Sequence, residues 1–556
     1  MSLYWIALIG GLLFLAAYFT YGRFLSRHFG LNPTQKTPAE ELNDGIDFVP
    51  TQKGFLLGQH FSAIAAAGPI VGPILAGLWF GWFPVLLWIL FGAIFFGAVH
   101  DFSSLVGSVR HRATSIAEIV KDYFGPRGHL FFLLFVWFSL IYVITAFTDI
   151  TSSSFVEPEL GGGVATSSLL YLLIGVIMGF ALYKYKMPLG IATAIFLPLV
   201  LLAIWFGRMM PITITGSASM SAQQIWNIVL LVYCLIASVI PVWMLLQPRG
   251  YLGGFFLYVT LAAGMIGLFL GGEKIQYPAF IGFTNEKGFP LFPILFVTVA
   301  CGACSGFHGI VCSGTTSKQI SKETDCKMVG YGGMLLEGLI AVIALSTVMI
   351  LAKSDPLVHS SPDRVYAEGI SRFVQNFGIP RDFARAFTLL AFTTFIYDTL
   401  DVATRLARYI FQELTGLKNV WGRIVATMAS LAIPLFCVSL KITDASGAVI
   451  PAWKVFWTIF GTSNQLLAAL TLMILSVWLH RSGKTWWMSA IPMVFMMVVT
   501  LWSLSLMIKP MLVGIFSGTF QLDFIALVAL FLFILALLLI TEAIKMAFPP
   551  LKNYSH

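Results

Sequence analysis

The chain has 556 residues, of which 58% are hydrophobic and 10% are charged, whereas an average soluble domain has roughly 25% charged residues. Together with a mean hydropathy of +0.88, this composition excludes a soluble globular protein and indicates an integral membrane protein. The net charge of +8 does not indicate a nucleic-acid partner, because the basic residues collect on alternate loops between apolar segments.

Apolar segments fill most of the chain. A bilayer core of about 30 Å requires about 20 apolar residues per helix, and fifteen segments have a suitable length. The sequence therefore predicts an all-α polytopic membrane protein with about 15 transmembrane helices. The predicted spans are residues 4–22, 55–80, 82–107, 128–148, 166–183, 188–207, 223–247, 251–271, 291–315, 330–352, 384–404, 421–440, 455–478, 486–508 and 522–544.

The basic residues predict the orientation of the chain. If the N-terminus is outside, 22 of the 33 Lys and Arg residues, including Arg249, fall on inner loops. The positive-inside rule then favours an odd number of spans, with the N-terminus outside and the C-terminus inside. The first span has neither a basic leader nor an Ala-x-Ala cleavage pattern, so we expect it to be a retained helix.

Two of the predicted spans contain helix-breaking residues. The second reads Gly-Pro-Ile-Val-Gly-Pro from Gly68 to Pro73, and the ninth contains Gly302, Gly306 and Gly309. Proline removes a backbone donor and glycine loosens a helix, so both spans are predicted to be discontinuous, the first with a new half-helix after Pro73. Backbone groups freed at this depth require a cavity rather than lipid. Paired broken helices point to the binding site of a secondary transporter.

The broken spans run in opposite directions across the predicted topology. Five spans starting at each break would form two repeats of inverted topology. The predicted organisation is residues 1–53 as an N-terminal accessory helix and loop, 54–207 as the first repeat, 208–290 as two accessory helices, 291–478 as the second repeat and 479–556 as C-terminal accessory helices.

Five segments between residues 44 and 470 resemble a known family. They read DGIDFVPTQKGFLLGQHFSAIAAAGPIVGPILA, VHDFSSLVGSVRHRATSIAEI, CGACSGFHGIVCSGTTSKQI, LDVATRLARYIFQEL and FGTSNQLLAAL. The chain closely resembles the carbon starvation protein family, CstA. This resemblance implies a bacterial or archaeal inner-membrane transporter, related to the amino acid, polyamine and organocation superfamily, with a LeuT-like core.

The same resemblance implies a function. Members of the family are expected to import peptides or pyruvate, the latter by proton symport, under carbon starvation. The implied partners are a peptide or pyruvate, a coupling ion (H+ or Na+) and membrane lipid, with no cofactor and no enzymatic activity. The sequence itself does not choose between the two solutes or between the two ions.

Polar side chains precede the first predicted break, where they could meet a solute together with freed backbone. A half-helix starting at the break would turn its positive dipole end towards the midplane, which favours a carboxylate. The alternative is a packing surface of small residues between helices. The candidate substrate-binding residues are Gln59, His60, Ser62, Gly68, Pro69 and Gly72.

A second group of candidates surrounds the break in the ninth span. Ser305 and His308 are three residues apart, so they share a face if the helix persists between them, and Gly306 lies between them. Asn464, in the thirteenth span, could bond an unwound backbone or a substrate. Serine and threonine often bond their own helix, so the hydroxyl-rich stretch that follows His308 carries little weight by itself.

Charged residues inside a span cost roughly 2.5 to 3.5 kcal/mol on insertion scales and therefore need a partner or a cavity. Asp398 and Asp401 lie three residues apart near the inner end of the eleventh span. An ion pair between Asp401 and Arg405 is the structural alternative to a role in coupling. By the LeuT-like resemblance, Asp398 and Asp401, with Thr394, are candidates for proton or sodium binding.

Other polar residues in the spans receive structural interpretations. His100, Asp101 and Glu337 are expected to be structural, the His-Asp pair as an anchor at a helix end. A metal site formed by His60, His100 and His308 is the less favoured alternative, although histidine binds zinc well.

Two other classes of protein remain as alternatives. An intramembrane serine hydrolase would use Ser305 and His308, but a base must lie within hydrogen-bond reach of its nucleophile, which their spacing does not favour. The common catalytic motifs are absent from the sequence. A channel would require a continuous polar pore.

Overall fold

The computed structural model describes residues 2–44, 48–65, 67–217, 219–241, 243–286, 288–375, 377–417, 419–440, 442–443, 449–518 and 523–547. Within these ranges the named secondary-structure elements are helices, apart from a two-stranded antiparallel ladder in which β1 (Ile442–Thr443) pairs with β2 (Val449–Ile450). The predicted all-α polytopic class is therefore confirmed.

In the described part of the chain, 13 helices are long and apolar enough to cross a membrane. They are Leu3–His28 (α1 and α2), Trp82–Arg110 (α6, η1 and α7), Ile116–Phe155 (α8), Gly161–Tyr183 (α9), Leu189–Met209 (α10), Ala222–Val239 (α11), Leu246–Leu270 (α12), Glu323–Met349 (η4, η5 and α16), Arg381–Thr415 (α18), Val420–Ser439 (α19), Ala452–Arg481 (α20), Trp487–Ser517 (α21) and Phe524–Met546 (within α22, Phe524–Ala547).

Two further predicted spans are discontinuous. The first consists of α4 (Lys53–Ile64) and α5 (Gly68–Phe80), which meet at an angle of 49° and together pass the same length and hydropathy test. The second consists of the short helices α13 (Leu291–Thr298), α14 (Ala300–Ala303) and α15 (Gly306–Val311). The exact number of about 15 spans stays a prediction, because this second segment has no single helix of spanning length.

Short elements complete the described fold. The described residues form three π-helical segments, of which η1 and η5 lie within spans, and two further α-helices and three 3-10 turns, of which η4 forms the start of the span Glu323–Met349. They are η1 (Ala93–Gly97), η2 (Cys312–Thr316) and η5 (Lys327–Tyr331) among the π-helices, α3 (Pro38–Glu41) and α17 (Pro362–Gln375) among the α-helices, and η3 (Ser317–Gln319), η4 (Glu323–Asp325) and η6 (Pro356–His359) among the 3-10 turns.

Local sequence signals explain several helix ends. The Ser115 hydroxyl accepts a hydrogen bond from the backbone N–H of Glu118 at the start of α8, and Ser221 with Gln224 forms a reciprocal capping box at the start of α11. Such caps satisfy amide groups that have no partner within the helix. Gly125 has φ of 71° within α8, a conformation that favours glycine, and it kinks the helix between its first turns and its apolar part.

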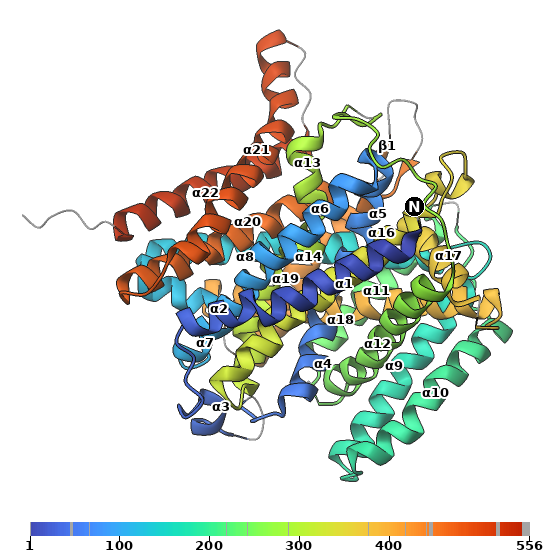
Figure 1. Ribbon diagram of the computed structural model, residues 1–556, viewed down its shortest axis with the longest axis horizontal. Coiled ribbons are helices and arrows are strands. Elements are labelled where there is room, and N and C mark those ends of the chain that lie inside the picture. The colour runs from blue at the N-terminus through green and yellow to red at the C-terminus, as the bar shows by residue number, and fades with distance from the viewer. Residues whose placement is uncertain are drawn as a thin grey trace, which may run out of the picture.

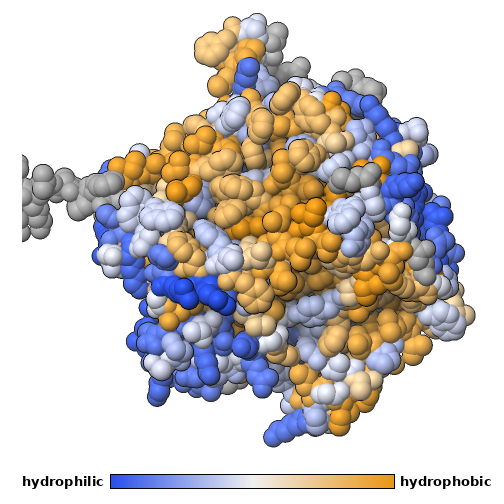
Figure 2. All heavy atoms as spheres, viewed as in Figure 1, coloured by the Kyte–Doolittle hydropathy of each residue, from blue (hydrophilic) through white to orange (hydrophobic). Residues whose placement is uncertain are grey.

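The surface and the interior differ in the way expected for a membrane protein. Figure 2 shows an apolar band across one face of the molecule, with hydrophilic residues gathered at two opposite edges. Large apolar side chains such as Leu202 and Trp205 on α10 are more than half exposed, as lipid contact requires. In contrast, α16, α18 and α20 lie in the interior (Figure 1), and the apolar stretch of α20 is wholly buried.

Candidate functional site

The first break lies immediately before the Gly-Pro-rich motif. The α4 helix ends at Ile64, Ala65 has φ of −79° and ψ of 74°, and α5 begins at Gly68. Pro69 falls in the first turn of α5, where a missing N–H leaves no helical hydrogen bond unmade. Pro73 lies inside a continuous helix. The prediction that the second half-helix begins after Pro73 is therefore wrong, whereas the discontinuity of the span is confirmed.

The second break lies where the sequence predicts it. Cys304 and Ser305 adopt extended conformations between α14 and α15. The backbone N–H of Phe307 donates to Oδ1 of Asn464 at 2.9 Å, which supplies a partner for a donor freed by the break. The Asn464 amide also reaches Ser305 Oγ at 3.0 Å and Cys301 Sγ at 3.3 Å. The predicted candidates Ser305 and Asn464 are thus in contact.

The two broken spans pack closely against each other through glycines. A Cβ atom added at Gly68 would lie 2.3 Å from Cys301 Sγ, and one at Gly72 would lie 2.4 Å from the carbonyl oxygen of Thr298. At Gly306 it would lie 2.4 Å from the carbonyl oxygen of Asn464. Gly72 and Gly306 thus contact the backbones of α13 and α20, and Gly68 contacts the side chain of Cys301 on α14, as the small-residue alternative expects.

A buried ion cluster lies next to the first broken span. We define the arginine cluster as Arg249, Asp398, Asp401 and Tyr233, from α12, α18 and α11. Arg249 Nη2 lies 2.7 Å from Asp398 Oδ1, and Nη1 of the same guanidinium contacts Asp401 Oδ2. The hydroxyl of Tyr233 donates to Asp401 Oδ2 at 2.8 Å. Two carboxylates therefore share one guanidinium in the interior of the protein.

The arginine cluster is tied to the broken span. Ser62 on α4 donates its hydroxyl to Asp398 Oδ2 at 3.1 Å. Gly253 on α12 leaves the space for this contact, because a Cβ there would lie 2.7 Å from Asp398 Oδ2. Thr394 is buried one turn before Asp398 on α18. Two predicted candidates, Ser62 and Asp398, are thus in contact, and a third, Thr394, lies one helical turn from Asp398.

Two expectations about arginines are wrong. Arg249 does not lie on an inner loop, because α12 begins at Leu246 and carries the residue, fully buried, into the interior. The sequence does contain a signal for this placement. Arg249 lies between two apolar segments, and the helix formed by the second segment can begin early enough to include it. Asp401 does not pair with Arg405, whose Nη2 donates to the carbonyl oxygens of Ala237 at 2.7 Å and Ile240 at 2.9 Å.

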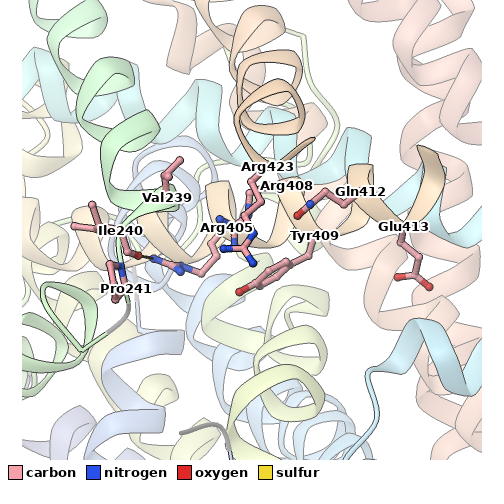
Figure 3. A pocket seen from close by; sticks show the side chains of 9 residues that line it. All are labelled: Val239, Ile240, Pro241, Arg405, Arg408, Tyr409, Gln412, Glu413 and Arg423. Carbon is pink, nitrogen blue, oxygen red and sulfur yellow. Dashed lines mark hydrogen bonds between the residues drawn. The ribbon is translucent and has the colours of Figure 1, made fainter. Parts of the chain in front are cut away.

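Arg405 instead lines a pocket of about 590 Å³ at the end of α18. Figure 3 shows its guanidinium directed at the backbone near Ile240, with Arg408 and Arg423 close to Tyr409. The pocket opens to the surface and is basic, so it is distinct from the packed interior between the two breaks.

Four further titratable residues meet inside the protein. We define the histidine cluster as His100 and Asp101 on α7, His308 on α15 and Glu337 on α16. His308 Nδ1 lies 2.9 Å from Asp101 Oδ2, and its Nε2 lies 3.1 Å from Glu337 Oε2. His100 Nδ1 lies 2.8 Å from Asp101 Oδ1. All four side chains are at most 1% exposed, so the expectation that His100 and Asp101 anchor a helix end at the interface is wrong.

The remaining candidates lie nearby on α4. His60 is buried and its Nδ1 lies 2.9 Å from Thr316 Oγ1 in η2. Gln59 is half-buried. The α4 half-helix therefore contacts the arginine cluster through Ser62 and the second broken span through His60.

The geometry bears on the alternative chemistries. Both ring nitrogens of His308 face carboxylates and Ser305 bonds to Asn464, so the pair is not arranged as nucleophile and base. Among the described residues, no group of three or more His, Cys, Asp and Glu side chains is arranged to hold a metal ion. Cys301, Cys304 and Cys312 are buried free thiols.

Known proteins resemble this chain over most of its length. The "Pyruvate/proton symporter BtsT" of Escherichia coli is 28% identical, over 93% of this chain and 83% of its own length. The "Peptide transporter CstA" of Bacillus subtilis is 32% identical, over 82% of each chain. A solved manganese transporter from Eremococcus coleocola aligns over 91% of this chain and 98% of its own at 14% identity, with a TM-score of 0.45.

The apolar spans, together with relatives that are named as a symporter and a peptide transporter, define a multi-pass membrane transporter. The family model described as "Carbon starvation protein CstA" matches residues 2–358 and 352–503. The chain therefore belongs to the carbon starvation protein CstA family.

Proposed function

We propose that this protein is a secondary active transporter that imports peptides or pyruvate by ion symport, with H+ as the coupling ion, under carbon starvation. It lies in a bacterial or archaeal inner membrane with its N-terminus outside and its C-terminus inside. The observation that carries the proposal is the contact of two discontinuous spans in the interior, with a buried ion cluster bonded to one of them through Ser62 and Asp398.

Contacts between helices support a LeuT-like core of two inverted five-helix repeats, residues 54–207 and 291–478. The first spans of the two proposed repeats pack together through α5 and α14, the second through α6 and α16, and the third through α8 and α18. Such like-with-like packing is expected when two repeats are related by a two-fold axis in the membrane plane. The accessory segments are then residues 1–53, 208–290 and 479–556.

The solute site is proposed to lie between the two breaks. Pyruvate and peptides both carry a carboxylate, and this region offers the donors of an amide, hydroxyls and histidines. Because Gly68 and Gly72 bring the two spans into close contact, a solute can enter only after the two broken spans move apart. The proposed contacts are Gln59, His60, Ser62, Gly68, Pro69, Gly72, Ser305, Gly306, His308 and Asn464.

The coupling ion is proposed to bind at Asp398 and Asp401, with Thr394 beside them. Counting charges, the single positive charge of Arg249 faces two carboxylates, so the arginine cluster has one negative charge in excess when both are ionised. A buried uncompensated charge is costly, and a proton or Na+ would remove it.

The test is uptake of labelled pyruvate and of a labelled dipeptide into proteoliposomes, with pH and sodium gradients imposed separately. We expect one of these solutes to be concentrated when the outside is acidic. Accumulation that follows only the sodium gradient would replace H+ by Na+, and no accumulation of either solute under either gradient would reject the proposed function.

Asp401→Asn is expected to abolish gradient-driven uptake while leaving membrane insertion intact, because the amide cannot take up the coupling ion's charge. Asp122→Asn is the matched control, since Asp122 is exposed at the start of α8 and should transport as the wild type does. Full gradient-driven uptake by Asp401→Asn would remove Asp401 from the coupling site.

A further inference from the structure

We propose that the histidine cluster is a second proton-binding site, in which Glu337 takes up and releases a proton beside the second broken span. This inference rests on the proposed function for its role in transport, but the site itself is argued from the geometry of His100, Asp101, His308 and Glu337. The sequence predicts structural roles for His100, Asp101 and Glu337 and a contact with solute for His308.

The two ring nitrogens of His308 limit where the protons of the cluster can lie. Each of its ring nitrogens faces a carboxylate oxygen, at 2.9 Å from Asp101 and 3.1 Å from Glu337. A neutral imidazole has one N–H donor and one acceptor, whereas an imidazolium has two donors. Either His308 carries a positive charge between two carboxylates, or His308 is neutral and Glu337 carries the proton. Both arrangements fit the same heavy-atom positions.

Glu337 is the member with room for a proton. Asp101 accepts hydrogen bonds on both oxygens, one from each histidine. Among the described residues neither oxygen of Glu337 makes a hydrogen bond, because the contact with His308 has the distance of an ion pair but not the direction of a hydrogen bond. A fully buried carboxylate without hydrogen-bond donors is costly when ionised. Protonation at Glu337 relieves that cost.

The net charge of the histidine cluster also favours protonation of Glu337. With His308 as imidazolium and His100 neutral, the two carboxylates leave the cluster with a net charge of −1. Uptake of one proton forms an O–H bond on Glu337 and brings the cluster to neutrality. When the site later opens to water, that O–H bond breaks and water accepts the proton, which restores the starting charge.

Other titratable groups surround the cluster and set its field. His60 on α4 lies within electrostatic range of both Asp101 and His308. The thiols of Cys301, Cys304 and Cys312 line the same broken span as His308, and all three are buried. A positive charge on His60 would oppose uptake of a further proton, so occupation of the cluster depends on the α4 half-helix as well.

The backbone around the cluster is built to shift. Every π-helical segment in the described part of the chain lies within six residues of a cluster residue: η1 ends three residues before His100, η2 begins four residues after His308, and η5 ends six residues before Glu337. Single-turn π-helical segments occur frequently at functional sites and can kink a helix. The three helices that share the proton therefore each carry a point at which register can change.

Glycines let the imidazole rings approach neighbouring backbones. A Cβ at Gly309 would lie 3.1 Å from His100 Nε2, and one at Gly333 would lie 3.0 Å from His60 Cδ2. A change in charge on either ring therefore acts directly on α15 or α16. Because the rings lie so close to these helices, binding of a proton in the histidine cluster is linked to the position of the second broken span relative to α7 and α16.

Infrared difference spectroscopy of the full chain in lipid tests the site without relying on transport. Between alkaline and acidic pH, we expect a carbonyl band of a buried protonated carboxylic acid that is lost in Glu337→Gln and retained in Asp398→Asn. His308→Gln retains hydrogen-bonding groups, now those of an amide, but removes the positive charge near Glu337. Glu337 should then take up its proton at higher pH, so the band should appear at higher pH. An unchanged band in Glu337→Gln, with the variant folded, would overturn the proposal.

Transport measurements separate this proposal from the proposed function. If Glu337 carries one of the coupled protons, Glu337→Gln should accumulate about tenfold less solute for each unit of pH gradient, because a tenfold concentration ratio corresponds to about 1.4 kcal/mol. Solute exchange across the membrane without a gradient should continue. Equal accumulation by variant and wild type would overturn the inference and leave the proposed function standing.

Failure of the wild type to transport either solute would reject the proposed function and not the proton site. If Glu337→Gln does not fold, His308→Gln supplies the spectroscopic test alone: a band whose pH midpoint equals that of the wild type would contradict proton binding beside His308.

Discussion

The arginine and histidine clusters differ in the kind of cation that holds their carboxylates together. Arg249 is permanently charged, since a guanidinium does not lose its proton in proteins, and it contacts both Asp398 and Asp401. His308 also lies between two carboxylates, Asp101 and Glu337, but an imidazole is a cation only when both of its ring nitrogens carry a proton.

This difference separates two roles that the sequence alone would merge. In the arginine cluster the permanent cation holds both carboxylates and, under the proposed function, leaves one carboxylate in excess for the coupling ion. In the histidine cluster the proposed proton binds at Glu337 and changes the net charge of the cluster by one. The α4 half-helix contacts the first cluster through Ser62 and lies within electrostatic range of the second through His60.

The largest expected effect comes from removing the permanent cation. Arg249→Leu leaves two buried carboxylates without their partner, and breaking one side of a buried ion pair costs about 3–5 kcal/mol. We expect a large fall in the thermal unfolding temperature of the protein in detergent. Adding Asp398→Asn and Asp401→Asn should recover part of this loss. A single variant as stable as the wild type would contradict the assignment of Arg249 as the central cation.

The next largest effect is expected from a substitution at the contact between the two broken spans, away from both clusters. Gly68→Ala places a Cβ 2.3 Å from Cys301 Sγ, and overpacking of this kind costs about 1–3 kcal/mol. We expect reduced stability and slower transport, measured by thermal unfolding and initial uptake rate. Gly190→Ala on α10 is the control, because no atom lies within 4 Å of its added Cβ. Equal behaviour of the two variants would argue against close packing at the breaks.

The smallest effect tests the link between α4 and the arginine cluster. Ser62→Ala removes the hydrogen bond to Asp398, and bonds to charged groups contribute about 1.5–3 kcal/mol. We expect a change at the lower end of this range, with weaker dependence of uptake on the gradient. Ser505→Ala, which removes an exposed bond within one helix, serves as control. If both variants keep the wild-type coupling, α4 does not act through Ser62.

The sequence predicted the class of fold and which two spans are broken, because apolar length and Gly or Pro content act locally along the chain, although it placed the start of the second half-helix of the first broken span after Pro73 rather than at Gly68. It placed Arg249 on a loop, whereas the residue lies inside α12. Whether a helix extends to include a charged residue at its end depends on whether that charge has a buried partner. That partner, Asp398, lies 149 residues away. The histidine cluster was missed for the same reason: its four residues come from three separate helices, and no spacing in the sequence records their meeting.

Chemical modification of Cys301 tests most directly whether the two breaks separate during transport. In a variant that keeps Cys301 as its only cysteine, we expect the thiol, 8% exposed in this conformation, to react with a water-soluble alkylating reagent faster when a transported solute and a gradient are present. A parallel variant keeping only Cys437 on α19 should react at a rate that does not depend on the solute. Protection of Cys301 under every condition, in protein that still transports, would contradict a solute path between the broken helices.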